Sequence, residues 1–320
     1  MENGFLKTKL KDYPIGFIGT CLGAATLANV FSSHGYPMIL DIFIYVGSVA
    51  LLIYILKLIM YPKVVWGEMN NTIFMALYPT TTMLLMNIGV YFAKFNYSIG
   101  HGIWLFALLL NVFYVVFFLI RHVIIKFDIT TVLPCWYVLL AGISVSCVTS
   151  EPMHAKALVK PIFYFIVMAV LTSLPVVIYR LKTVEVPDHQ YPLIGIFAAP
   201  GSLCTISYVT LYPHPNVYLV SFFFALSVAA VIFDYLNLPR VMSLKFSPAF
   251  AGYTFPLAIA LVASVKVYGY LTKFGFHNYA EIVKWICGIE FFMTTAIIGF
   301  ILFNFIFNYF FNIPKFKFTK

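Results

Sequence analysis

The sequence carries little charge. Only 10% of its 320 residues are Asp, Glu, Lys or Arg, whereas 62% are hydrophobic. Soluble domains contain about a quarter charged and about half apolar residues, so this composition excludes an ordinary soluble fold. Apolar stretches of about 20 residues, the length that crosses a bilayer as a helix, recur along the whole chain. We therefore expect a single all-α transmembrane domain over residues 1–320.

The sequence also lacks the motifs of common enzyme and metal sites. Its five cysteines all fall inside predicted spans, and no pair has the spacing of a metal site or a disulfide framework. There is no phosphate-binding loop, zinc-protease motif or nucleophile elbow. We therefore expect no catalytic residue, metal or cofactor, and a membrane protein that is not an enzyme.

Five prolines recur at regular intervals and divide the chain into five similar units. They are separated by 65, 55, 66 and 56 residues, and each lies early in an apolar stretch: Pro14, Pro79, Pro134, Pro200 and Pro256. About 60 residues is the length of two membrane helices with their loops. A proline inside a membrane helix removes a backbone hydrogen bond and bends the helix. The pattern predicts five helical hairpins in quasi-five-fold arrangement, with five kinked odd helices around a central pore.

The predicted membrane spans number ten, and the distribution of basic residues orients them. The spans cover residues 14–33, 39–60, 72–93, 98–120, 131–150, 158–179, 191–212, 216–236, 249–270 and 283–310. With ten spans, 14 of the 20 Lys and Arg residues fall on one side, including all three arginines. The positive-inside rule makes that side cytoplasmic, so both termini are predicted to be cytoplasmic. The net charge of +9 then reflects topology and requires no nucleic-acid partner.

Few ionisable residues lie within the predicted spans. Glu290 lies inside the tenth span and is the one candidate for a proton-coupling group, with a structural carboxyl as the alternative. Asp41, Lys57 and Asp234 lie near span ends and are expected to be interfacial anchors. The five proline-bearing spans contain no Asp, Glu, Lys or Arg before Lys266. A pore with such a lining would bind ions weakly and release them readily.

Small residues follow the first proline. Gly16, Gly19 and Gly23 are spaced by three and four residues, so they share one helix face. Glycines on one face let two membrane helices approach closely, and in a pore-lining helix they also leave room for an ion. Both roles, close packing and pore lining, remain open for these three residues.

Several of these motifs resemble those of one family of membrane proteins. The stretch 14–23 (PIGFIGTCLG) resembles the first helix of the tellurite-resistance/dicarboxylate transporter family, which includes bacterial TehA proteins and plant slow-type anion channels. Pro134-Cys135-Trp136 is similar to the family's fifth-helix motif, and the stretches 198–202 (AAPGS) and 252–256 (GYTFP) are similar to those of its seventh and ninth helices. The stretch around Pro79 is only loosely similar.

The resemblance implies a homotrimer in which each subunit has its own pore, and it implies that Phe255 closes that pore as a gate. It also implies transport of small anions such as chloride and nitrate across the plasma membrane. We therefore expect an anion channel embedded in membrane lipid. The alternative is a proton-coupled carrier for a C4-dicarboxylate such as malate, or for sulfite.

Overall fold

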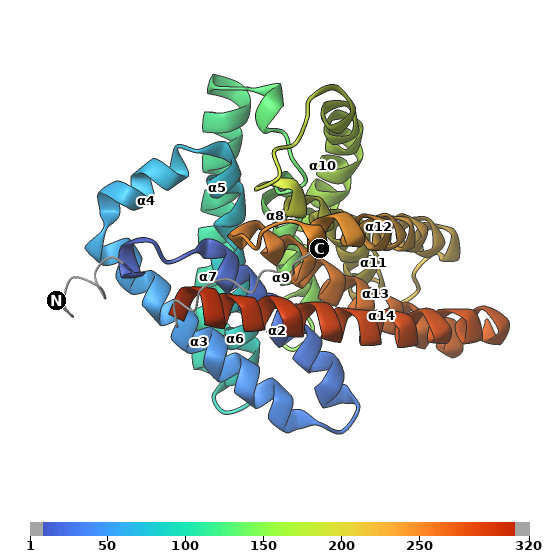
Figure 1. Ribbon diagram of the computed structural model, residues 1–320. Helices are drawn as coiled ribbons and strands as arrows, with labels where there is room; N and C mark the ends of the chain where they lie inside the picture. Colours follow the sequence, from blue (N-terminus) through green and yellow to red (C-terminus); the bar gives the residue numbers. More distant parts are fainter. Residues whose placement is uncertain (1–8, 311–320) are drawn as a thin grey trace.

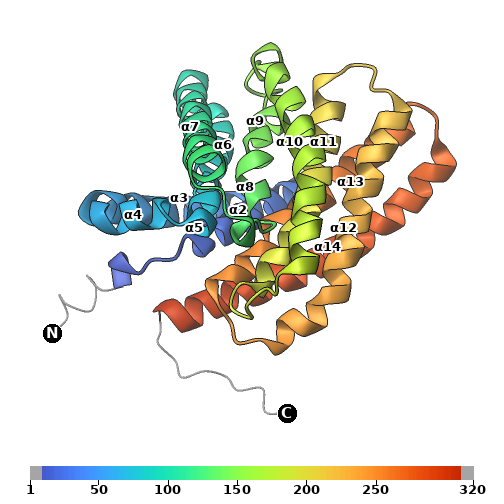
Figure 2. The same ribbon diagram turned by 90° about the horizontal axis from the view of Figure 1, so that it is seen from above.

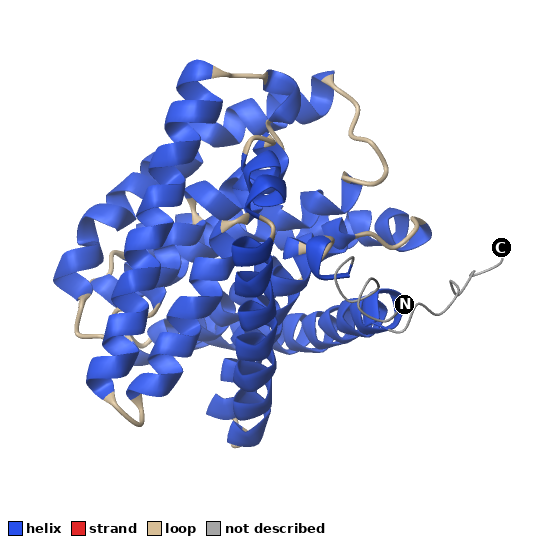
Figure 3. Cartoon of the chain, turned by 90° about the vertical axis from the view of Figure 1, so that its left-hand side faces the viewer, coloured by secondary structure: helices blue, strands red, loops and turns tan. Residues whose placement is uncertain are grey.

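A computed structural model describes residues 9–310, and within that range the chain is built from helices and loops, with no strand (Figure 3). Nine helices of the described residues are long and apolar enough to cross a membrane, and a shorter apolar helical stretch covers Trp136–Val148. The described part of the chain is thus a multi-pass helical bundle.

Five long helices form the outer layer of the bundle (Figures 1 and 2). Most side chains of this layer point away from the protein. In the apolar stretch of Lys156–Thr183, for example, only 22% of the residues are buried. The five are α3 (Pro37–Met60), α7 (Tyr97–Phe118), α10 (Lys156–Thr183), α12 (Val217–Ser243) and α14 (His277–Phe305).

The inner layer consists of the proline-bearing segments, and between 67% and 94% of the residues in the apolar stretches of its four long segments are buried. The most buried of these stretches lies in Tyr191–Leu211, where 94% of the residues are buried. The inner helices are α2 (Ile15–Ser33), α5 (Thr72–Leu77) with α6 (Pro79–Ala93), α8 (Trp136–Leu140) with α9 (Val145–Val148), α11 (Ala198–Leu211) and α13 (Phe255–Lys273). Each of these five segments contacts the next along the chain, and α13 contacts α2, so they close a ring.

The structure corrects the prediction that all ten spans are continuous helices. The fifth span, predicted at residues 131–150, consists of α8, a 3₁₀ turn at Gly142–Ser144 and α9, joined without a full-length helix. Several outer helices are longer than predicted, since α10 extends to Thr183 and α12 extends to Ser243. Four of the basic residues used to orient the chain, Lys7, Lys315, Lys317 and Lys320, lie outside the described residues.

The five repeat prolines begin helices and do not bend continuous ones. Pro14 caps the start of α2, Pro79 is the first residue of α6, and Pro256 is the second residue of α13. Pro134 precedes α8, and Pro200 is the third residue of α11. Proline is favoured in a first helical turn because its missing N–H group would have no partner there. The prolines therefore mark where each main inner helix begins.

An ion pair between a buried lysine and a partly exposed glutamate connects the starts of two inner helices. Lys57, 2% exposed at the end of α3, pairs with Glu68 at 2.7 Å and donates a hydrogen bond to the carbonyl of Tyr13 at 2.9 Å. The Tyr78 hydroxyl donates to the other oxygen of Glu68 at 2.8 Å. Because Tyr13 and Tyr78 directly precede the repeat prolines Pro14 and Pro79, this network links an outer helix to α2 and α6.

Candidate pore

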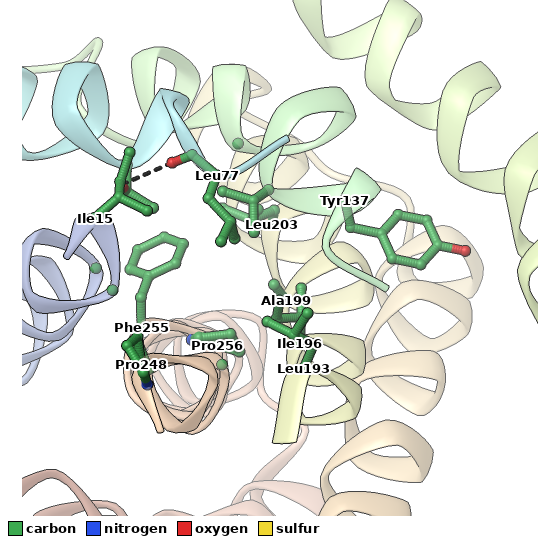
Figure 4. Close-up of a pocket in the computed structure, with 17 residues that line it drawn as sticks. Ile15, Leu77, Tyr137, Leu193, Ile196, Ala199, Leu203, Pro248, Phe255 and Pro256 are labelled. Carbon is green, nitrogen blue, oxygen red and sulfur yellow. Dashed lines mark hydrogen bonds between the residues drawn. The ribbon is translucent and has the colours of Figure 1, made fainter. Parts of the chain in front are cut away.

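A small cavity lies at the centre of the inner ring, and all five inner segments line it (Figure 4). Its volume is about 30 Å³, whereas one water molecule needs about 10–15 Å³ by the same measure. Gly19, Thr80, Val138, Ala199 and Phe255 represent the five segments in its wall. The cavity holds about two water molecules, so an anion could pass only if lining side chains moved.

Phe255 is the largest side chain directed into this cavity. Figure 4 shows its ring extending from the start of α13 toward Ile15 of α2 and Leu77 of α5. The side chain is 5% exposed and forms part of the cavity wall beside α2. An aromatic side chain in this position narrows the cavity on the side of α2 and α5.

The backbone that carries Phe255 is held against α2. The Thr254 hydroxyl donates hydrogen bonds to the carbonyls of Gly19 at 3.2 Å and Ala251 at 2.7 Å. A Cβ atom added to Gly23 would lie 2.6 Å from the backbone nitrogen of Phe255, closer than unbonded atoms approach. Gly23 therefore allows the two backbones to touch, and this contact sets the position of the Phe255 ring.

The three glycines of the first span differ in their surroundings. Gly16 lines the cavity and also packs tightly, because an added Cβ would lie 2.4 Å from the carbonyl oxygen of Pro248. Gly19 lines the cavity with room beside it, since its nearest contact would be Thr80 at 3.6 Å. Gly23 is absent from the cavity wall and makes only the close backbone contact with α13.

The cavity wall is almost free of polar groups. None of the described residues that line it is Asp, Glu, Lys, Arg or His. The Thr80 hydroxyl is already bonded to the carbonyl of Leu77 at 2.8 Å, and the Tyr137 hydroxyl is turned away from the cavity in Figure 4. Of the repeat prolines only Pro256 lines this cavity. Such a wall supplies no fixed charge to bind an ion.

The ionisable residues named from the sequence lie outside the cavity. Glu290 of α14 is 3% exposed, and its Oε2 has no hydrogen-bond partner among the described residues. Asp41 is half-buried and accepts a hydrogen bond from Tyr91 at 2.8 Å. The prediction of an interfacial anchor is wrong for Lys57 and for Asp234, which are 2% and 0% exposed. Burial of both residues depends on packing of the outer helices against the ring, which span boundaries alone do not reveal.

Several lining residues were not identified from the sequence. Leu193, Ile196, Ala251 and Gly252 belong to two 3₁₀ helices, η4 (Tyr191–Phe197) and η5 (Pro248–Tyr253), that lead into α11 and α13. Aligning the repeats on their prolines would have located them, because they fall within eight residues of Pro200 or Pro256. In the same alignment Ala199 and Phe255 occupy equivalent positions, directly before a proline.

The buried ring of five segments, the outer helices with their exposed apolar side chains and the uncharged central cavity define a multi-pass helical membrane protein with a candidate pore. A family model described as the voltage-dependent anion channel family, SLAC1, matches residues 12–308. The chain therefore belongs to this family. A relative described as an uncharacterized transporter, from Methanocaldococcus jannaschii, is 24% identical over 321 aligned positions, covering 88% of this chain and 90% of the relative.

Proposed function

We propose that this protein is a passive channel for small inorganic anions and that Phe255 is its gate. The observation that carries the proposal is the position of the Phe255 ring in a cavity lined by all five inner segments. A lining without fixed charge binds ions weakly, as fast conduction requires. Membership of an anion-channel family supports a negatively charged permeating ion.

The proposal includes a location and an assembly. We place the protein in the plasma membrane with both termini in the cytoplasm, on the strength of the basic residues that collect on one side of the predicted topology. We also propose a homotrimer with one pore in each subunit, an arrangement suggested by the resemblance to the family.

The gate assignment is tested by Phe255→Ala in purified protein reconstituted into planar bilayers. Removing the ring should raise the anion current by about tenfold or more, which corresponds to a barrier lower by about 1.4 kcal/mol. Phe292→Ala is the matched control, because Phe292 lies on α14 and is 73% exposed. An unchanged current in a correctly folded Phe255 variant would refute the assignment.

A second substitution tests whether the cavity is the conduction path. Gly19→Ala adds one methyl group to the cavity wall, and its nearest neighbours, Thr80 and Ala251, are at ordinary contact distances of 3.6 and 3.8 Å. The protein should therefore fold normally, while the current of the Phe255→Ala background should fall. A current that is insensitive to Gly19→Ala would place the path elsewhere.

The second candidate function is a proton-coupled carrier for a C4-dicarboxylate or sulfite. One observation favours it, namely the buried Glu290 carboxyl with an oxygen that has no partner among the described residues. A carrier must couple such a group to the substrate path, but Glu290 lies outside the cavity wall. Reversal potentials in proteoliposomes separate the two functions, because a channel follows the anion gradient alone.

A further inference from the structure

A second and much larger cavity lies on the outside of the ring. It has a volume of about 680 Å³ and is formed by α10 and α12, each of which packs against α11 (Figure 2). Its floor is the inner segment 194–201, including Ile194, Phe197, Pro200 and Gly201. We call it the lateral groove. Its walls belong to two outer helices, so it faces the surroundings of the protein and not the central cavity.

The walls of the lateral groove are apolar along most of their length. One face of α10 contributes Val170, Leu174 and Ile178, spaced by four residues, and one face of α12 contributes Leu226, Ala230 and Phe233. From Val170 to Lys182 the α10 wall is roughly 18 Å long at the helical rise of about 1.5 Å per residue. One leaflet of the hydrocarbon core is about 15 Å thick, half of about 30 Å. The groove thus matches the reach of one acyl chain.

Polar side chains gather at one end of the groove and carry both signs of charge. Lys182 is exposed in the last turn of α10, Glu185 is exposed two residues beyond the end of that helix, and Arg240 lines the groove from α12. The Arg240 guanidinium stacks on the Tyr191 ring at 3.8 Å and lies 3.8 Å from an Asp188 carboxylate oxygen. Both partners of that ion pair are more than half exposed, so it is weak and leaves the guanidinium free to bind a phosphate.

We propose that the lateral groove is a binding site for a membrane phospholipid with a zwitterionic headgroup. One acyl chain would lie between α10 and α12, and the phosphate would be bound by Lys182 and Arg240. Arginine is well suited to this role because its planar fork matches phosphate oxygens. Glu185 and Asp188 would face the ammonium group of a headgroup of the phosphatidylethanolamine type.

The groove lies directly behind the central cavity. The segment whose outer side forms the groove floor also lines the central cavity, through Leu193, Ile196 and Ala199. Phe197 links the two sides, because its ring centroid lies 5.6 Å from that of Phe233 in the groove and 6.1 Å from that of Tyr137. A bound acyl chain would therefore support this segment from behind. Lipid binding itself does not depend on the proposed channel function.

The test measures lipid binding to the full-length, delipidated protein in detergent by native mass spectrometry, titrated with phosphatidylethanolamine. The variant Ala229→Phe/Ala230→Phe fills the groove and should lose one bound lipid per subunit. Ala225→Phe, on the same helix but outside the groove lining, should keep it. Lys182→Ala/Arg240→Ala should weaken the affinity by about tenfold or more, whereas Lys245→Ala should not change it.

If the filled variant misfolds, photolabelling of the unaltered protein still tests whether a lipid occupies the groove. A phosphatidylethanolamine with a photoreactive acyl chain should label peptides covering 170–182 and 226–240 in reconstituted protein. Labelling spread evenly over α3, α7 and α14 would overturn the proposal, as would an unchanged lipid count in the filled variant. A filled variant that alters only the oligomeric state would show that a second copy of the chain, and not a lipid, occupies the groove.

Discussion

The inner segments and the outer helices differ in opposite directions in hydrophobicity and in burial. Each outer helix is more hydrophobic than every long inner helix, although the inner helices are far more buried. In a soluble protein the order would be reversed. Bilayer lipid is as apolar as the protein interior, so apolar side chains gain little from being inside, and inner contacts rely on small and hydroxyl residues that permit close packing.

The same contrast appears in how the helices are held together. The inner segments meet by backbone contact at Gly16 and Gly23, where an added Cβ would lie within 2.6 Å of a neighbouring atom, and Gly201 of α11 makes a similar contact, at 2.7 Å, with Ser227 of the outer helix α12. Among the described residues, no atom lies within 4 Å of a Cβ added to the outer glycines Gly288 and Gly299 of α14. The close-contact positions of the ring are therefore intolerant of added volume, whereas the two exposed glycine positions on α14 accept it.

The largest expected effect comes from substituting glycine in the two layers. Gly23→Ala would place a methyl group 2.6 Å from the backbone of Phe255, so the helix contact must open, and we expect a large loss of folded protein. Gly299→Ala on α14 meets no atom of residues 9–310 within 4 Å and should be neutral or stabilising by up to about 1 kcal/mol from helix propensity. Thermal unfolding in detergent compares them, and equal stability of the two variants would contradict the contrast between layers.

The next effect concerns the charge buried where an outer helix meets the ring. Lys57→Met leaves Glu68, which is 20% exposed and keeps the hydrogen bond from Tyr78, without its cation and should destabilise the protein by about 1–3 kcal/mol. The matched control is Lys156→Met, which breaks the exposed pair with Glu151 and should cost at most about 1 kcal/mol. Adding Glu68→Gln to Lys57→Met should recover part of the loss. If both lysine variants unfolded at the same temperature, the Lys57 network would not stabilise the ring.

A smaller effect is expected in ion selectivity. Because the cavity wall holds no fixed charge, the cost of removing water from the ion should dominate its passage, and nitrate and iodide should permeate more readily than chloride. Permeability ratios of the Phe255→Ala variant at equal ionic strength on both sides measure this. A preference for small, strongly hydrated anions would require a charged filter inside the inner ring.

The smallest effect is expected at Glu290. This residue lies on an outer helix and outside the cavity wall, so we predict that it is structural and that Glu290→Gln leaves transport and its response to a proton gradient unaltered. Flux in proteoliposomes with and without a pH gradient is the measurement. If uptake by the natural protein were driven by protons and the variant lost only that drive, the carrier function would replace the channel.

The sequence by itself determined the membrane class, the five-fold repeat and nearly all the spans. These follow from local properties, namely the length of apolar stretches and the spacing of Pro14, Pro79, Pro134, Pro200 and Pro256. It also singled out Phe255, but only through resemblance, because nothing local distinguishes that residue among 34 phenylalanines.

Only the tertiary structure decided which face of each segment lines the cavity and where the buried charges lie. Lys57 pairs with Glu68, which is only 11 residues away along the chain. The same ammonium group also donates a hydrogen bond to the carbonyl of Tyr13, 44 residues away, and this distant contact ties α3 to the start of α2. The broken fifth span and the 3₁₀ segments η4 and η5 likewise depend on packing between units. Such contacts join residues that are distant along the chain. Their energies depend on the distances and angles between packed segments, which cannot be read from a local sequence pattern.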